Sequence, residues 1–253
     1  METFKEIELK AIWTNDICKE EILEYIAIQK NVFKDSYSVK KFQKKFQDNI
    51  YGYSLIIFAY LDNKCVGAMV FWRNDIQGIK AYQPCEMVVR QEFRGYGIFR
   101  KMNNMGVEKI GKNTLFYNYP NDNSLPPYLK MGWEVHSRQR YKIYNPITDA
   151  KEIMKIDEEY LGWLFNDTSS ENMDLLKYVR INKKYYLLKK KKKNIYLIIG
   201  EIPKESALFI SKAKLPLLLH YSSKGYIGRG IVRVTRTANK ELNIPLYKIG
   251  PLF

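Results

Sequence analysis

Residues 85–97 combine a carboxylate inside an apolar run with a pair of glycines, and both features could take part in chemistry. The run Cys85-Glu86-Met87-Val88-Val89 is short, apolar and β-branched, so it predicts a buried strand. An acidic side chain inside such a strand is costly to bury without a reason, which makes Glu86 a candidate general base. The alternative is a structural carboxylate that pairs with a nearby Arg or backbone N–H.

A glycine-containing turn follows this strand. Arg94-Gly95-Tyr96-Gly97 opens a stretch of helical character from Ile98 to Lys112. A strand that turns through glycines into a helix leaves backbone N–H groups unpaired and points the positive end of the helix dipole at one place. Because glycine has no side chain, a ligand can come close. The pattern predicts a diphosphate site, although a Gly-x-Gly pair also occurs in turns that bind nothing.

A second motif lies about thirty residues downstream and strengthens this interpretation. The two stretches, Arg94-x-x-Gly97-x-Phe99 and Asn121-x-x-Ser124-x-x-x-Tyr128 with Gly132-Trp133 after it, resemble the GNAT superfamily of acyl-CoA-dependent N-acyltransferases. The resemblance extends from about Thr3 to Tyr144. One departure stands in the loop, because Phe99 occupies a position where the family has a small residue.

The resemblance implies a cosubstrate and roles for named residues. Acyl-CoA would be bound by strand amides and by the glycine loop, and Asn121 would help to hold its pantetheine arm. The implied cofactor-binding residues are Met87, Val88, Val89, Arg94, Gly95, Tyr96, Gly97, Ile98, Phe99, Asn121 and Ser124. Tyr128 would donate a proton to the departing thiolate, and Glu86 would act as the base, directly or through a water. The alternative for Tyr128 is a core tyrosine on a short amphipathic helix.

The predicted fold is α/β. Residues 1–146 are expected to form a GNAT-type mixed sheet flanked by helices, and residues 147–253 a second, smaller, degenerate GNAT-like half on the acceptor side. The elements predicted before the central strand are a strand at Phe4–Trp13, helices at Cys18–Val32 and Val39–Phe46, and a hairpin of Ser54–Tyr60 with Cys65–Trp72. Those predicted after it are strands at Leu115–Tyr119 and Trp133–Tyr144, with a short helix between them that Asn123 or Ser124 can cap.

The second half shows weaker patterns and no further cofactor motif. It predicts helices at Met154–Phe165 and Ala207–Leu219, and strands at Lys184–Leu188, Asn194–Ile199, Ile231–Thr235 and Leu246–Ile249. The five lysines 189–193 are interpreted as a solvated turn, with a phosphate-attracting rim as the alternative.

Composition limits the classes of partner. The net charge of +15 predicts attraction to polyanions, which could be nucleic acid, an anionic membrane surface or phosphorylated small molecules. Basic and aromatic residues are mostly segregated, which argues against nucleic acid. No apolar run is long enough to span a membrane, and three widely spaced cysteines form neither a disulfide framework nor a metal site, so we expect a cytoplasmic protein without a metal.

Together these observations predict an N-acyltransferase that works by direct attack of an amine on the thioester. The stretch from Tyr119 to Trp133 and the two-part layout resemble bacterial acyltransferases of surface-polysaccharide pathways, which implies a dTDP- or UDP-linked amino sugar as acceptor. The alternatives are a small amine or peptide terminus as acceptor, or a CoA- or nucleic-acid-binding module without catalysis. A homodimer is left open.

Overall fold

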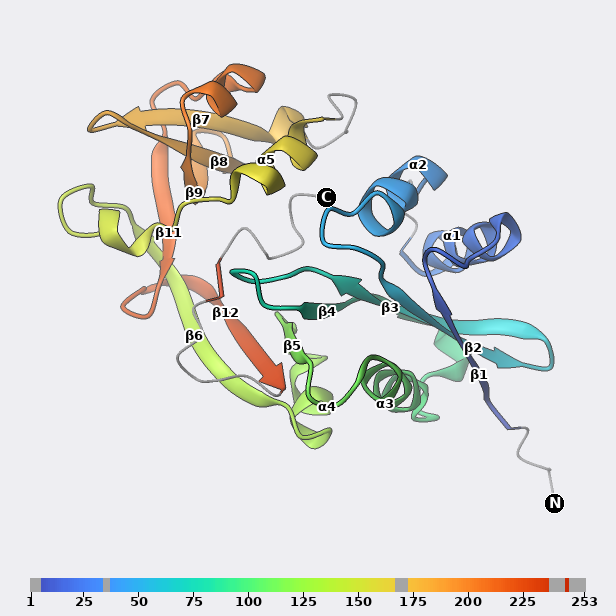
Figure 1. The fold of residues 1–253 in the computed structure, drawn as a ribbon. Coiled ribbons are helices and arrows are strands. Elements are labelled where there is room, and N and C mark those ends of the chain that lie inside the picture. Colours follow the sequence, from blue (N-terminus) through green and yellow to red (C-terminus); the bar gives the residue numbers. More distant parts are fainter. Residues whose placement is uncertain (1–5, 34–36, 167–172, 237–243, 246–253) are drawn as a thin grey trace. The chain divides into compact units, whose positions relative to one another are not determined.

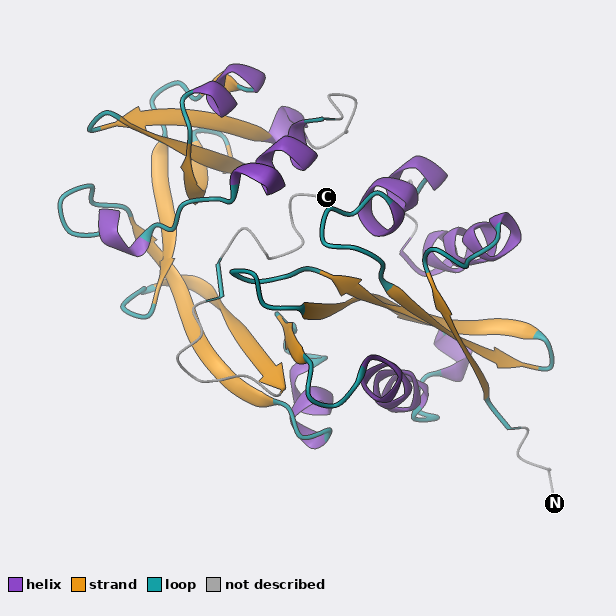
Figure 2. Ribbon diagram, viewed as in Figure 1, coloured by secondary structure: helices purple, strands orange, loops and turns teal. Residues whose placement is uncertain are grey.

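The computed structural model describes residues 6–33, 37–166, 173–236 and 244–245, and this part of the chain contains both helices and strands (Figures 1 and 2). It packs as two compact units. The first comprises residues 1–118, 122–134 and 234–242, and the second comprises residues 119–121, 135–233 and 243–253.

The first unit is a mixed sheet with helices on both faces. Its strands are β1 (Glu8–Trp13), β2 (Leu55–Leu61), β3 (Lys64–Arg73), β4 (Ala81–Val89) and β5 (Leu115–Asn118). They lie in the order β1-β2-β3-β4-β5. The pairs from β1 to β4 are antiparallel and the β4–β5 pair is parallel. The last residues of β12, 234–236, run antiparallel to β5.

The helices of this unit are α1 (Lys19–Phe33), α2 (Val39–Phe42) with a π turn at Gln43–Gln47, α3 (Ile98–Ile110) and α4 (Leu125–Lys130). A 3-10 turn at Gln91–Phe93 precedes α3. Helices α1 and α2 cover one face of the sheet, and α3 covers the other (Figure 1). Helix α3 approaches β3 closely at Gly106, where a Cβ would lie 1.9 Å from the ring of Phe71. The core between the layers is rich in aromatic side chains.

The second unit is built mainly of strands. They are β6 (Glu134–Ile143), β7 (Leu176–Ile181), β8 (Lys184–Lys192), β9 (Ile195–Ile202), β10 (Ser211–Lys212), β11 (Leu217–Ser222) and β12 (Ile227–Arg236). Six of them follow the order β6-β11-β9-β8-β7-β10. One helix, α5 (Glu158–Phe165), and 3-10 turns at Ala150–Glu152, Met173–Leu175 and Glu205–Phe209 complete its described part. A cluster that includes Tyr144, Tyr186 and Ile198 forms a core.

Most predicted elements of the first unit are confirmed. The hairpin turn at Asp62 and Asn63 places both residues at positive φ, as a two-residue connection between antiparallel strands requires. Gly111 ends α3 with φ of 109°, and Ser124 with Pro126 and Pro127 opens α4. Strand β4 begins at Ala81, four residues earlier than the apolar run indicated.

Three predictions for the second half are wrong. The lysine run is not a turn, because Lys189, Lys190 and Lys192 pair with β9 in antiparallel register and only Lys193 lies in the connection. Helix α5 begins at Glu158 rather than Met154, because the backbone of residues 154 and 156 bonds to Glu201.

The third wrong prediction is the helix at Ala207–Leu219. Pro216 is the tenth of the 13 residues in this segment, and a proline beyond the first turn of a helix removes a hydrogen bond and clashes with the preceding turn. Residues 217–219 instead pair in parallel with β9. The strand predicted at Leu246–Ile249 lies outside the described residues.

Candidate active site

The glycine loop has the backbone that a phosphate-binding turn requires. Gly95 has φ of 90° and Gly97 has φ of 71°, and Gly97 is the N-cap residue of α3. A Cβ built at either glycine would have no protein atom within 4 Å. The side chain of Arg94 folds back, with Nε donating to the carbonyl of Val89 at 3.2 Å. The loop is therefore anchored at Arg94 and open at its glycines.

Strand β4 contains a bulge immediately before this loop. Ala68 of β3 pairs with Val88, and Val70 pairs with Cys85, so β4 has one extra residue between these pairs. Glu86 lies in the bulge with φ of 48°, which is rare for a residue that is not glycine. The carboxamide of Gln29 stabilises this backbone by donating to the Glu86 carbonyl at 2.7 Å.

The β4–β5 pair diverges after its first residues. The registered pairs between these two described strands are Ala81–Leu115 and Tyr82–Phe116. Beyond them, the strand residues that we predicted to bind a pantetheine arm, Met87, Val88 and Val89, have no pairing with β5. An extended, amide-rich ligand could add to β4 there as an extra strand.

The Glu86 carboxylate accepts three hydrogen bonds from the α1–α2 layer. Tyr25 and Tyr37 donate their hydroxyls to Oε2 at 2.6 and 2.7 Å, and the Lys45 ammonium donates to Oε1 at 2.7 Å. Lys45 is almost completely buried and lies 4.9 Å from the centre of the Trp72 ring. The Glu86 side chain keeps 19% of its surface exposed. A carboxylate has about four acceptor positions, so one remains for a further donor.

These contacts set the protonation state of the pair. Burial by itself raises the pKa of Glu86, but the Lys45 ammonium and the three hydrogen bonds outweigh it and bring the pKa below its ordinary value. Burial lowers the pKa of Lys45, and the Glu86 carboxylate more than compensates, so that pKa is raised. Both groups are therefore charged at neutral pH. Sequence reasoning identified Glu86 but missed its three partners, which come from residues 41 to 61 positions away.

Tyr128 lies on α4 with its ring 3% exposed. Its hydroxyl oxygen accepts a hydrogen bond from Nδ2 of Asn118 at 2.7 Å, so its own O–H is not used in that contact. Burial raises the pKa of Tyr128, which keeps the phenol protonated at neutral pH. Asn118 was not predicted, although its place at the end of β5 is where a strand presents a polar side chain to a site.

At the position of Phe99 a small residue would leave open space, and here the phenyl ring fills it. Its ring packs edge-on against the Tyr128 ring, with centroids 5.2 Å apart, and Trp133 packs on Tyr128 at 4.8 Å. The first turn of α3 therefore contacts the Tyr128 ring directly. Phe99 and Trp133 fix the orientation of this phenol.

The remaining predicted residues lie in the glycine loop, at the start of α3, and at or before the start of α4. Tyr96 is 58% exposed and Ile98 is buried under the start of α3. Ser124 is the N-cap residue of α4. Asn121 is exposed and packs as part of the second unit, so its predicted contact with a pantetheine arm stays a prediction.

The residues around the loop fit a CoA-type diphosphate. The open space at Gly95 and Gly97 admits a close approach, and the first amides of the 13-residue helix α3 supply donors and a positive dipole end. Within the described part of the chain, no group of three or more His, Cys, Asp or Glu side chains could hold a metal. No helix among the described residues is long and apolar enough to cross a bilayer.

Comparison with known proteins gives structural matches alone. No protein-family profile and no curated sequence matches the chain. A probable N-acyltransferase of unknown function from Enterococcus faecalis V583 superposes with a TM-score of 0.53 at 12% identity, covering 91% of this chain and 72% of its own. A GCN5-related N-acetyltransferase from Kribbella flavida gives 0.53 at 10% identity, covering 90% and 71%. The chain therefore has the fold of GCN5-related N-acetyltransferases, over nearly its full length.

Proposed function

We propose that this protein transfers an acyl group from acyl-CoA to a primary amine. The observation that supports the proposal best is the contact between Phe99 and Tyr128, because it holds a protonated phenol beside the helix start that fits a diphosphate. An acyl-CoA whose diphosphate lies at that helix start and whose pantetheine arm follows β4 would bring its thioester sulfur toward the Tyr128 phenol. The shared fold is consistent with this arrangement.

Binding of the cosubstrate uses main-chain groups. Amides at Gly97 and in the first turn of α3 hold the diphosphate, and the unpaired side of β4 at residues 87–89 holds the amides of the pantetheine arm. Acyl-CoA supplies the acyl group as a thioester, and the protein provides the donors that polarise it. An acyl-enzyme intermediate is not needed. Burial raises the pKa of Cys65 and of Cys85 to about 12, so both thiols are un-ionised and poorly nucleophilic at neutral pH.

Glu86 acts on the amine. Its lowered pKa makes it a weak base, so it holds the acceptor ammonium by charge and accepts the proton through a water, rather than removing it in a single strong-base step. The one remaining acceptor position on the carboxylate suits this role. Lys45 keeps Glu86 ionised, and Tyr25 and Tyr37 fix its rotamer.

Tyr128 acts on the leaving group. The amine nitrogen forms a bond to the thioester carbon and the carbon–sulfur bond breaks. The Tyr128 O–H stabilises the developing thiolate and donates its proton to the sulfur, and the phenolate that is left regains a proton from solvent water. The raised pKa of this phenol exceeds that of an ordinary thiol, about 8.5, so complete proton transfer is uphill. The rate enhancement from Tyr128 is therefore at the lower end of the range for a general acid.

The acceptor in this proposal is a dTDP- or UDP-linked amino sugar, and the reaction takes place in the cytoplasm. A diphosphate-bearing acceptor suits the net charge of +15, most of which belongs to the second unit. A small amine or peptide terminus is the alternative acceptor. A binding module for CoA or nucleic acid without catalysis remains a separate alternative, because Phe99 departs from the usual loop sequence.

A thermal-shift panel tests the proposal. Acetyl-CoA, dTDP- and UDP-linked amino sugars, the corresponding nucleotides without sugar, and single- and double-stranded DNA are each added to the purified chain. A ligand at a hundredfold excess over its dissociation constant stabilises the folded state by about 2.7 kcal/mol. We expect acetyl-CoA and an amino-sugar nucleotide to raise Tm together. Stabilisation by DNA alone would contradict the proposal.

A further inference from the structure

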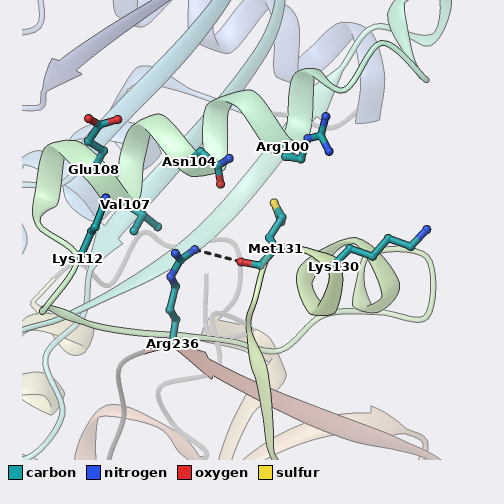
Figure 3. Close-up of a pocket in the computed structure, with 8 residues that line it drawn as sticks. All are labelled: Arg100, Asn104, Val107, Glu108, Lys112, Lys130, Met131 and Arg236. Carbon is teal, nitrogen blue, oxygen red and sulfur yellow. Dashed lines mark hydrogen bonds between the residues drawn. The ribbon is translucent and has the colours of Figure 1, made fainter.

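A cavity of about 420 Å³ lies on the first unit, and neither Glu86 nor Tyr128 is among the residues that line it (Figure 3). It is bounded by one face of α3, by the C-terminal end of α4 and by the last residue of β12. Arg100, Asn104 and Glu108 lie on the α3 wall at intervals of four residues, so the helix places all three on the same side. Val107, which is 2% exposed, adds an apolar area to this wall.

Four cationic residues and one acidic residue are among those that line the cavity. Arg100 lies on α3, and Lys112 is the second residue after that helix ends. Lys130 lies on α4, and Arg236 is the last residue of β12. Glu108 is the acidic member. Like charges gathered around one space repel each other, and an anion in that space relieves the repulsion. The lining therefore favours a ligand of at least two negative charges.

Arg236 is held in place by one of its own hydrogen bonds. Nη1 donates to the carbonyl of Met131 at 3.2 Å, which also satisfies a backbone acceptor at the end of α4. A guanidinium has five N–H donors in a planar fork, so this contact leaves others that can bind a phosphate. Figure 3 shows the Arg236 side chain reaching between α3 and α4 into the middle of the cavity.

We propose that this cavity binds the phosphate group of a phosphorylated small molecule. Its volume is within the range of small-ligand pockets, about 300–1,000 Å³. The cations suit the phosphate, and Val107 with the aliphatic part of Met131 suits an attached ring or chain. Binding of inorganic pyrophosphate at the cavity does not depend on acyl transfer.

The far end of the cavity is separate from the glycine loop. Helix α3 has 13 residues and a rise of about 1.5 Å each, so Lys112 lies roughly 20 Å along the axis from the Gly97 amide. The 3′-phosphate of acyl-CoA is on the same ribose as its diphosphate, so a CoA held at Gly97 cannot bring that phosphate to Lys112. The phosphate in the cavity therefore belongs to a ligand other than acyl-CoA.

Calorimetric titration with inorganic pyrophosphate at low salt tests the site. The titration uses Gly97→Val as background, so that the glycine loop does not contribute. In this background Lys112→Gln with Arg236→Gln should weaken binding at least about fivefold, because two phosphate contacts are lost. Lys112→Gln alone, which keeps the Arg236 bond to Met131, should weaken it about twofold.

The control removes the same charge elsewhere on this unit. Lys19→Gln with Lys109→Gln changes two exposed lysines that do not line the cavity, and pyrophosphate affinity should stay within about twofold. Equal weakening by the control pair would overturn the proposal, since it would show a general charge effect. Absence of any pyrophosphate binding in the Gly97→Val background would overturn it as well, and would leave the proposed acyl transfer intact.

Titration of CoA and of 3′-dephospho-CoA into the otherwise unchanged chain tests this assignment. The double variant should change neither affinity, while it still weakens pyrophosphate binding. A loss of affinity for CoA and not for 3′-dephospho-CoA would overturn the assignment and place the CoA 3′-phosphate in the cavity.

Discussion

The Glu86 carboxylate and the Lys45 ammonium form a buried pair that two tyrosines complete. Taking both charges out of water is costly, so the pair is weak evidence for net stability, but removal of one partner leaves the other uncompensated. Substitution of one partner should therefore have a measurable effect on stability. The same carboxylate is the one that we assign to the acceptor amine.

We expect Lys45→Met to destabilise the protein by about 3 kcal/mol at pH 7 in urea denaturation, because Glu86 would remain ionised without its partner. In the wild type, the lowered pKa of Glu86 contributes stability above the unfolded-state pKa, and this is lost as pH falls through the folded-state value. In the variant, burial without Lys45 raises that pKa, so stability should increase as pH falls from 7 toward 5.

Glu86→Gln added to Lys45→Met removes the stranded charge and should recover much of the loss. Lys30→Met, at an exposed position of α1, is the control and should cost less than about 0.5 kcal/mol. A Lys45→Met variant as stable as this control would show that the pair is not buried in solution.

Tyr128→Phe retains the ring contacts with Phe99 and Trp133 and removes only the hydroxyl. We expect turnover to fall by roughly 10²–10⁴, toward the lower end because a thiolate is a fairly good leaving group. CoA affinity should remain within about twofold. Tyr53→Phe, at an exposed position, is the matched control. Unchanged turnover in Tyr128→Phe, under conditions where chemistry limits the rate, would make Tyr128 a core residue and no more.

At the scale of elements, local signals decided which predictions succeeded. The glycine pair before α3, the cap position of α4 at Ser124 and the hairpin of β2 and β3 follow local backbone preferences, and each was predicted correctly. The lysine run, the start of α5 and strand β11 depend instead on pairing with β9. Such long-range pairing overrides local propensity and does not appear in a single sequence.

Gly97→Val should reduce CoA affinity at least tenfold, about 1.4 kcal/mol, in calorimetry. The new side chain would occupy the open space at the loop and would strain a residue with φ of 71°. Gly111→Val is the matched control, because Gly111 caps the other end of α3 with φ of 109°. It should destabilise the helix without changing CoA affinity. Equal effects of the two substitutions would show that the loop is only a turn.

Strand β8 carries lysines that can influence the acceptor. We expect Lys190→Gln with Lys192→Gln to raise the acceptor KM and reduce its salt dependence, while leaving the KM for acyl-CoA unchanged. Lys19→Gln with Lys30→Gln, on α1, removes the same charge from the first unit as a control. If neither the acceptor KM nor its salt dependence changes, the lysines of β8 are a solvated strand surface without a role in recognition.

At the scale of the whole molecule, charge is divided unevenly between the two units. Lys and Arg outnumber Asp and Glu by 21 to 17 in the first unit and by 21 to 10 in the second. The first unit contains the glycine loop, Glu86 and Tyr128, so the excess charge does not follow the cofactor motif. This distribution is consistent with recognition of an anionic acceptor by the second unit.

Some residues of the candidate site could be predicted from the sequence and others could not. Glu86 and Gly97 were predicted because their own positions are unusual, a charge in an apolar strand and glycines at a helix start. Tyr128 was predicted because its stretch resembles a family motif. Tyr25, Lys45 and Asn118 have no such local signal, since a tyrosine or lysine on an amphipathic helix is ordinary. Their roles follow from packing between elements far apart in the chain.

A single-turnover reaction tests the central claim most directly. The protein is mixed in excess over acetyl-CoA with an amino-sugar nucleotide, and free thiol, N-acylated product and intact protein mass are followed together. Direct transfer predicts that thiol and product appear at the same rate, that the protein mass stays unchanged throughout, and that Tyr128→Phe slows both alike. An acylated protein, or thiol release without N-acylated product across amino-sugar, small-amine and peptide acceptors, would contradict the account.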